Sequence, residues 1–93
     1  MWPTTESQHN ARALVAKGAI LLDVRTPEEF SEQHVPEAKN IPVQELSARL
    51  TEVGAKNVPV VVYCRSGGRS AVAASILEKA GYQVVDIGPM QNW

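Results

Sequence analysis

The stretch that decides the fold of this 93-residue chain is Val58-Pro59-Val60-Val61-Val62-Tyr63-Cys64-Arg65-Ser66-Gly67-Gly68-Arg69-Ser70. Its first half is apolar and β-branched, which predicts a buried strand whose proline sits near the start, where a missing N–H does least harm. A helix over 70–80 follows, with apolar residues at helical spacing and Gly81 at its end. A buried strand, a glycine-bearing turn and a helix in direct succession are typical of a parallel α/β sheet.

The remaining segments repeat this alternation of strand and helix. Apolar runs over 19–24 and 82–87 predict two further strands, and a short extended piece is expected near Asn40-Ile41. Helices are predicted from the Thr4–Ser7 region to Gly18, from Thr26-Pro27 onward, and from Val43 to Gly54. We therefore expect one α/β domain over residues 1–93, with a parallel sheet covered by helices on both faces.

Composition excludes several classes of protein. The chain is 44% hydrophobic and 20% charged with a net charge of −1, which argues against a disordered tail and a coiled-coil rod. A chain with this charge balance lacks the excess of basic residues that binding to nucleic acid or to an anionic membrane requires. The first ten residues carry no basic residue or apolar run, so we expect a cytoplasmic protein, and we expect it to be a monomer.

The single cysteine, Cys64, is the candidate nucleophile. One cysteine makes neither an intramolecular disulfide nor, by itself, a structural zinc site, and we predict no metal and no cofactor. A free thiol has a pKa of about 8.5, which falls to about 3.5–7.5 beside a helix N-terminus or an arginine. Cys64 is expected beside both, so it is predicted to be largely thiolate at neutral pH.

The residues after Cys64 are predicted to bind an anion. Gly67 and Gly68 permit a backbone in which successive N–H groups point inward, and Arg65 and Arg69 add forked donors suited to a tetrahedral oxyanion. With Ser66, these residues are the candidate substrate-binding loop. The alternative is a cysteine that is only a small buried hydrophobe, which two neighbouring arginines disfavour. A phosphate-binding P-loop is disfavoured because the loop has no lysine.

At this loop the sequence resembles the rhodanese family of sulfurtransferases, and the resemblance covers nearly the whole chain. Four segments carry it in order: Leu22-Asp23-Val24-Arg25 with Glu29-Phe30 after it; His34 to Pro42; Val61 to Ser70; and Asp86-Ile87-Gly88-Pro89 with Trp93 after it. Three positions depart from the family pattern. Gln33 and Glu37 replace two glycines of the second segment, where they are expected to alter the turn, and Pro89 replaces a glycine of the last.

The resemblance implies a parallel sheet of about five strands and a two-step reaction. The thiolate of Cys64 would take the outer sulfur of a small anionic donor such as thiosulfate, release sulfite and leave a cysteine persulfide. Cyanide, a thiol or a protein acceptor would then remove that sulfur. Phosphatases of the same fold separate the cysteine and arginine by five residues, whereas four residues separate Cys64 from Arg69. A phosphatase, an arsenate reductase and a non-catalytic interaction module of this fold remain the alternatives.

Other polar residues are expected to support the site or the fold. Asp23, at the end of the first strand, is expected to orient a loop arginine or hydroxyl, and Ser70 is expected to support the loop. Arg25 and Glu29 are expected to form an ion pair that holds the fold. His34, in a loop between prolines, is expected to make a structural hydrogen bond, because sulfur transfer from a thiolate needs no general base.

Overall fold

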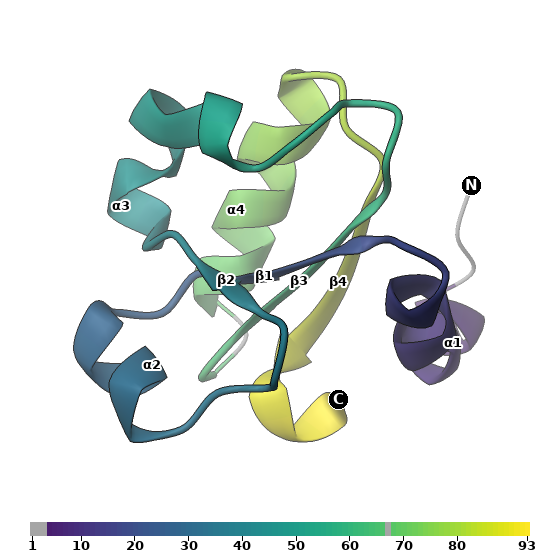
Figure 1. The fold of residues 1–93 in the computed structure, drawn as a ribbon, viewed down its shortest axis with the longest axis horizontal. Helices are drawn as coiled ribbons and strands as arrows, with labels where there is room; N and C mark the ends of the chain where they lie inside the picture. The colour runs from purple at the N-terminus through teal and green to yellow at the C-terminus, as the bar shows by residue number, and fades with distance from the viewer. Residues whose placement is uncertain (1–3, 67) are drawn as a thin grey trace.

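The sheet is entirely parallel. The computed structural model describes residues 4–66 and 68–93, and within them one sheet has the strand order β2-β1-β3-β4. The strands are β1 (Ile20–Asp23), β2 (Lys39–Asn40), β3 (Val60–Cys64) and β4 (Val84–Pro89). In Figure 1, β3 and β4 run downward and β1 and β2 run toward the left; because all pairs are parallel, the carboxyl ends gather at one edge of the sheet. That edge is where parallel sheets place functional groups.

Helices cover both faces of this sheet, as the sequence predicted. The helical elements are α1 (Thr4–Ala16), α2 (Pro27–Glu32), α3 (Val43–Leu46), η1 (Ser47–Glu52), α4 (Gly68–Lys79) and η2 (Met90–Asn92), where η marks a 3₁₀ helix. Figure 1 shows α1 on one side of the sheet and α3 with α4 on the other, while α2 and η2 lie near the carboxyl ends of the strands. Among the described residues, no helix has the length and apolarity to cross a membrane.

Alternate residues of β3 enter two different cores. Val60, Val62 and Cys64 pack on the face that α4 covers, in one cluster with Ala73 and Leu77. Val61 and Tyr63 pack on the opposite face, where Ala11 of α1 and Ile87 join them. Because successive side chains of a strand point to opposite faces, this alternation places Cys64 on the α4 side of the sheet.

Two expectations about the elements need correction. The sheet has four strands in the described residues, not about five, because the chain before β1 forms helix α1, which covers the sheet instead of extending it. The predicted helix from Val43 to Gly54 is broken into α3 and η1. Arg49 departs from helical geometry there (φ −121°, ψ 24°), and its guanidinium bridges the carboxylates of Glu45 and Glu52.

The turn before β2 contains a residue in a conformation that side chains disfavour. Glu37 has φ of 79°, and it stands where the resemblance places a glycine. The left-handed region brings Cβ close to the following carbonyl oxygen, which costs about 1–2 kcal/mol for a residue other than glycine. The glutamate therefore keeps the turn that a glycine would make and leaves it strained.

Replacing Glu37 with glycine should stabilise the protein. Relief of about 1–2 kcal/mol of backbone strain exceeds the loss of about 0.4–1 kcal/mol that glycine brings by adding freedom to the unfolded chain. We expect a net gain of about 0.5–1 kcal/mol in the free energy of urea unfolding for Glu37→Gly. Glu37→Ala, which keeps the Cβ, should show no increase in the free energy of unfolding. Equal increases for the two variants would show that the strain comes from the glutamate side chain and not from the backbone.

Candidate functional site

Cys64 is the last residue of β3 and has no exposed surface. Its Sγ atom lies 3.2 Å from the hydroxyl oxygen of Ser70, to which the thiol donates. Ser70 is also fully buried, and it belongs to the first turn of α4. The end of β3 thus places the sulfur against the N-terminal turn of a 12-residue helix, whose free N–H groups and dipole favour negative charge.

The rest of the predicted loop lies at the surface. Arg65 leaves the strand end outward, with 74% of its side chain exposed, and Ser66 is exposed as well. Gly68 begins α4, and a Cβ built on it would meet no heavy atom within 4 Å. Gly67 lies outside the described residues. Lack of space therefore does not explain the glycine at 68.

Arg69 points its guanidinium to a carboxylate on a different helix. Its Nη1 and Nη2 donate to Oε1 and Oε2 of Glu29 at 2.8 and 3.0 Å. These two bonds form the parallel fork that an arginine makes best with a carboxylate. They raise the pKa of Arg69, and the sulfur of Cys64 contributes to the same shift to a smaller extent. Arg69 is therefore electrostatically coupled to the cysteine while its fork is engaged by Glu29.

Glu29 is held in place by the start of α2. The backbone N–H of Thr26 donates to Glu29 Oε1 at 2.9 Å, and Thr26 Oγ1 accepts from the backbone N–H of Glu29 at 3.1 Å. This is a capping box; the sequence predicted Thr26 as the cap of this helix, and the bond back from Glu29 completes the box. The hydrogen bonds from Arg69 and then from Thr26 lower the pKa of Glu29 from its ordinary 4.5 to about 2. The carboxylate is thus ionised throughout the neutral range.

Asp23 has a different partner from the one expected. Its carboxylate, which is fully buried, accepts from the Arg25 backbone N–H at 2.9 Å and from Arg25 Nε and Nη2 at 3.0 and 2.6 Å. The reason lies in strand alternation: Leu22 packs in the Cys64 cluster, so Asp23, one residue later, points to the opposite face. Asp23 therefore holds Arg25 and not an arginine of the loop.

The expected ion pair between Arg25 and Glu29 is likewise wrong, since each has another partner. Arg25 is 5% exposed; besides Asp23, it donates to the carbonyl oxygen of Gln33 at 2.6 Å and lies over the ring of Tyr63. Burial raises the pKa of Tyr63 to about 12, and the nearby Asp23 carboxylate adds to this, so the hydroxyl stays protonated. Its oxygen accepts from the backbone N–H of Val35 at 3.1 Å.

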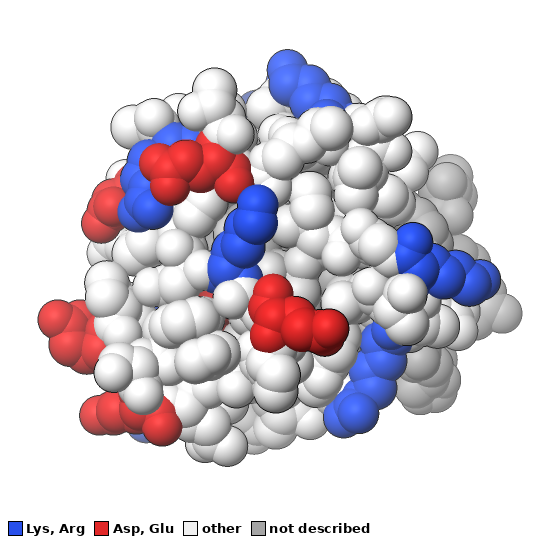
Figure 2. Space-filling model, in the orientation of Figure 1, with Lys and Arg blue, Asp and Glu red and all other residues white. Residues whose placement is uncertain are grey.

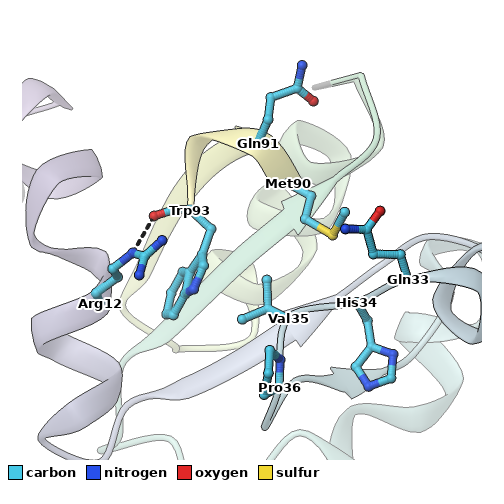
Figure 3. A pocket seen from close by; sticks show the side chains of 8 residues that line it. All are labelled: Arg12, Gln33, His34, Val35, Pro36, Met90, Gln91 and Trp93. Atoms are coloured by element: carbon cyan, nitrogen blue, oxygen red, sulfur yellow. Dashed lines mark hydrogen bonds between the residues drawn. The ribbon is translucent and has the colours of Figure 1, made fainter.

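Two adjoining hollows open beside the loop. The first, of about 300 Å³, is lined by Arg25, Glu29, Glu32, Gln33, Arg65, Met90 and Gln91. The second, of about 520 Å³, shares three of these residues and continues to Val35, Pro36, Arg12 and Trp93. In Figure 3 the Met90 side chain extends toward Gln33, while Arg12 of α1 donates from Nε to the Trp93 carbonyl oxygen at 2.6 Å. Cys64 lines neither hollow; of the loop residues, Arg65 lines the first, beside α2 and the C-terminal turn.

The charges around the site do not form a field of one sign. Basic and acidic side chains of the described residues are interspersed with uncharged surface on the face that Figure 2 shows. His34 is exposed, its Nδ1 donates to the Phe30 carbonyl oxygen at 2.7 Å, and its ring stacks on Phe30, in agreement with a structural role. Among the described residues, no group of three His, Cys, Asp or Glu side chains is arranged to hold a metal ion.

Sequence reasoning missed the role of Glu29 as the partner of the loop. Forty positions separate Glu29 from Arg69, so no helical or strand spacing could have paired them. The only signal was the carboxylate three positions after Thr26, which predicted a helix start and nothing more. The contributions of Met90 and Gln91 to the hollows were also unmarked in the sequence.

Comparison with known proteins bears on this site. The Rhodanese-like domain family matches residues 7–93. Thiosulfate sulfurtransferase PspE of Escherichia coli (strain K12) is 44% identical over 66 residues, which are 70% of this chain and 64% of that protein. A sulfurtransferase of Allochromatium vinosum is 40% identical over 63 residues, which are 68% of this chain and 58% of that protein. The chain thus spans somewhat less than two thirds of both relatives.

A solved structure, described as rhodanese with anions from E. coli, superposes with a TM-score of 0.75 at 38% identity. The match covers 82% of this chain and 92% of that one. A rhodanese-like domain protein from Staphylococcus aureus gives a TM-score of 0.79 at 29% identity, over 92% of this chain and 86% of that one. The α/β architecture of these proteins is therefore the architecture of this chain.

Breaking the buried ion pair should destabilise the domain strongly. Asp23→Asn leaves the guanidinium of Arg25 buried without its carboxylate, which costs about 3–5 kcal/mol. Asp86→Asn is the matched control, because Asp86 is partly exposed and its Oδ1 accepts the Gly88 N–H, a bond that an amide oxygen can also accept. Of these two variants, only Asp23→Asn should show a large loss in the free energy of urea unfolding. A loss below about 1 kcal/mol for Asp23→Asn, which is roughly the limit for surface substitutions, would contradict the role of the buried pair.

The ion pair of Glu29 and Arg69 should make the free energy of unfolding vary with pH in the acid range. The pKa of Glu29 is about 2 in the folded chain and has its ordinary value of 4.5 once unfolded. The carboxylate therefore contributes stability above pH 4.5, and that contribution is lost as pH falls from 4.5 to about 2. Unfolding free energies of the parent and of Glu29→Gln should differ at pH 6 and converge toward pH 2. A difference independent of pH would show that the charge of Glu29 does not stabilise the fold.

Proposed function

This chain belongs to the rhodanese-like domain family, and from that premise we propose that it is a sulfurtransferase that carries sulfur on Cys64. The observation that carries the proposal is the position of the thiol, at the end of β3, 3.2 Å from Ser70 in the first turn of α4. A sulfur anion there is stabilised by the N-terminal end of the helix and by hydrogen bonding. Sulfur transfer is also the activity that the names of the two relatives state.

The first step moves a sulfur atom from an anionic donor to the protein. The Cys64 thiolate attacks the outer sulfur of thiosulfate, the sulfur–sulfur bond of the donor breaks, and sulfite leaves with the bonding electron pair. The product is a persulfide anion on Cys64, so the total charge is unchanged. The hydroxyl of Ser70 can rotate to donate to a sulfur anion, because a hydroxyl is both donor and acceptor.

The second step returns the thiolate. An acceptor nucleophile, cyanide in an assay or a thiol in a cell, attacks the outer sulfur and takes it, and the electron pair of the sulfur–sulfur bond returns to Cys64. Neither step consumes a proton at a base, so no histidine is required. The exposed guanidinium of Arg65 is placed to attract the anionic donor toward the hollow beside the loop.

Access to the sulfur requires movement of groups above it. Cys64 has no exposed surface in the resting structure, and its neighbours in the loop, Arg65 and Ser66, are exposed. The donor therefore enters by displacement of loop atoms and not through an open channel. A small tetrahedral anion such as thiosulfate needs less displacement than the bulkier aryl phosphate.

The geometry gives less support to the phosphatase alternative. A phosphatase needs the fork of its loop arginine for the phosphoryl oxygens, and the fork of Arg69 is engaged with Glu29. The four-residue separation of Cys64 and Arg69 adds to this. We therefore propose thiosulfate as donor and place aryl-phosphate hydrolysis second.

The proposal is tested by persulfide formation on Cys64 and by the effect of Ser70→Ala on the rate of sulfur transfer. Incubation with thiosulfate should add one sulfur atom to the Cys64 peptide, as measured by mass spectrometry, and cyanide should remove it; Cys64→Ser should abolish both. Ser70→Ala should slow transfer by about tenfold or more, because a hydrogen bond to a charged group contributes about 1.5–3 kcal/mol.

Ser75→Ala is the matched control for Ser70→Ala, since Ser75 is exposed on the same helix, and it should keep the parent rate. Sulfur transfer by the Cys64→Ser protein would end the proposal. So would hydrolysis of an aryl phosphate by the parent at a higher rate than transfer of sulfur to cyanide.

A further inference from the structure

Glu29 lies between the two arginines of the loop. Its Oε1 and Oε2 accept the fork of Arg69 at 2.8 and 3.0 Å, and Oε2 is 3.6 Å from Nη1 of Arg65. One carboxylate on α2 therefore faces both of the cations that the sequence assigns to anion binding. The described residues give no other carboxylate within ion-pair distance of either arginine.

The two arginines are held very differently. Arg69 makes two hydrogen bonds and has 30% of its side chain exposed, whereas Arg65 makes a single contact beyond hydrogen-bond length and is 74% exposed. Arg69 is thus fixed by Glu29, and Arg65 is only drawn toward it. An anion that reaches the loop can take Arg65 from Glu29 at small cost, but it still approaches the negative charge of that carboxylate.

We propose that Glu29 sets the anion affinity of this site by competing with the donor for Arg65, an inference that rests on the sulfur-transfer function proposed above. Glu29 and Arg65 line the same hollow of about 300 Å³, so an anion that occupies it meets both charges. Removal of the carboxylate charge should strengthen anion binding, which is the reverse of what the loss of a purely structural ion pair would do.

The competition operates throughout the neutral range because Glu29 stays ionised there, its pKa being about 2. The anchoring contacts of the carboxylate come from Thr26 and Arg69, so its position does not depend on Arg65. Glu29 is therefore a fixed negative charge, and Arg65 is the mobile partner that exchanges between it and a bound anion.

The test measures binding of an inert anion, so that it does not depend on turnover. Sulfate has no sulfane sulfur to transfer; its dissociation constant is measured by calorimetry or amide chemical shifts in a Cys64→Ser background. Adding Glu29→Gln should tighten sulfate binding about two- to fivefold, the range expected for removing one exposed charge contact. Glutamine keeps an acceptor oxygen for the Thr26 N–H, so the helix start is retained.

Four further variants make the result specific. Glu28→Gln removes the same charge from the neighbouring exposed position of α2 and should change the sulfate affinity by less than the Glu29 change. Arg65→Ala should weaken sulfate binding, and Glu29→Gln added to Arg65→Ala should give less tightening than Glu29→Gln alone, because only the repulsion by the carboxylate is then removed. Glu29→Asp, whose carboxylate is one methylene shorter, should give an intermediate tightening and serves if the glutamine variant fails to fold.

The outcomes separate this inference from the proposed function. Sulfate binding that is unchanged or weaker in Glu29→Gln, tightening that is undiminished without Arg65, or no sulfate binding in any variant would overturn the role of Glu29. A protein that binds sulfate in the expected order but forms no persulfide on Cys64 with thiosulfate would overturn the proposed function and leave the competition established. In active protein, the KM for thiosulfate should fall in Glu29→Gln, a change that a structural role would not produce.

Discussion

The buried ion pair of Asp23 and Arg25 is the interaction on which the functional end of the sheet depends. It closes the end of β1, directs Arg25 to the carbonyl oxygen of Gln33 after α2, and lays the guanidinium over Tyr63 of β3. Both charges are nearly free of solvent, so each is tolerated only while the other is in place. The pair thus positions the α2 segment, which carries Glu29, relative to β3, which carries Cys64.

The site is assembled from three elements that meet because the sheet is parallel. β3 supplies the cysteine, the first turn of α4 supplies Ser70 and Arg69, and the start of α2 supplies Glu29. Each helix follows a strand end on the same side of the sheet, so their N-termini converge without any long connection. Two different ion pairs result. The buried pair of Asp23 and Arg25 holds the elements together, and the partly exposed pair of Glu29 and Arg69 leaves Arg65 available to an anion.

Several features were predictable because they depend on neighbours in sequence. The β3 strand, the helix after the loop and the Thr26 cap follow from apolar periodicity, glycine and proline positions, and a carboxylate three residues after a threonine. The placement of Cys64 at a strand end before a helix follows in the same way. The break at Arg49 and the positive φ of Glu37 were not predicted, because neither arginine nor glutamate marks a departure from ordinary backbone geometry.

The sequence by itself determined the order of strands and helices and the parallel sheet, and it singled out Cys64 as the candidate nucleophile, since periodicity and turn chemistry are local properties. Only the tertiary structure decided which charges pair. Asp23 turned out to hold Arg25 because alternation along β1 points it away from Cys64, and Glu29 turned out to hold Arg69 across forty positions of chain. Ion pairs form between side chains that folding brings together, so the spacing of two charged residues along the chain does not predict their distance in space.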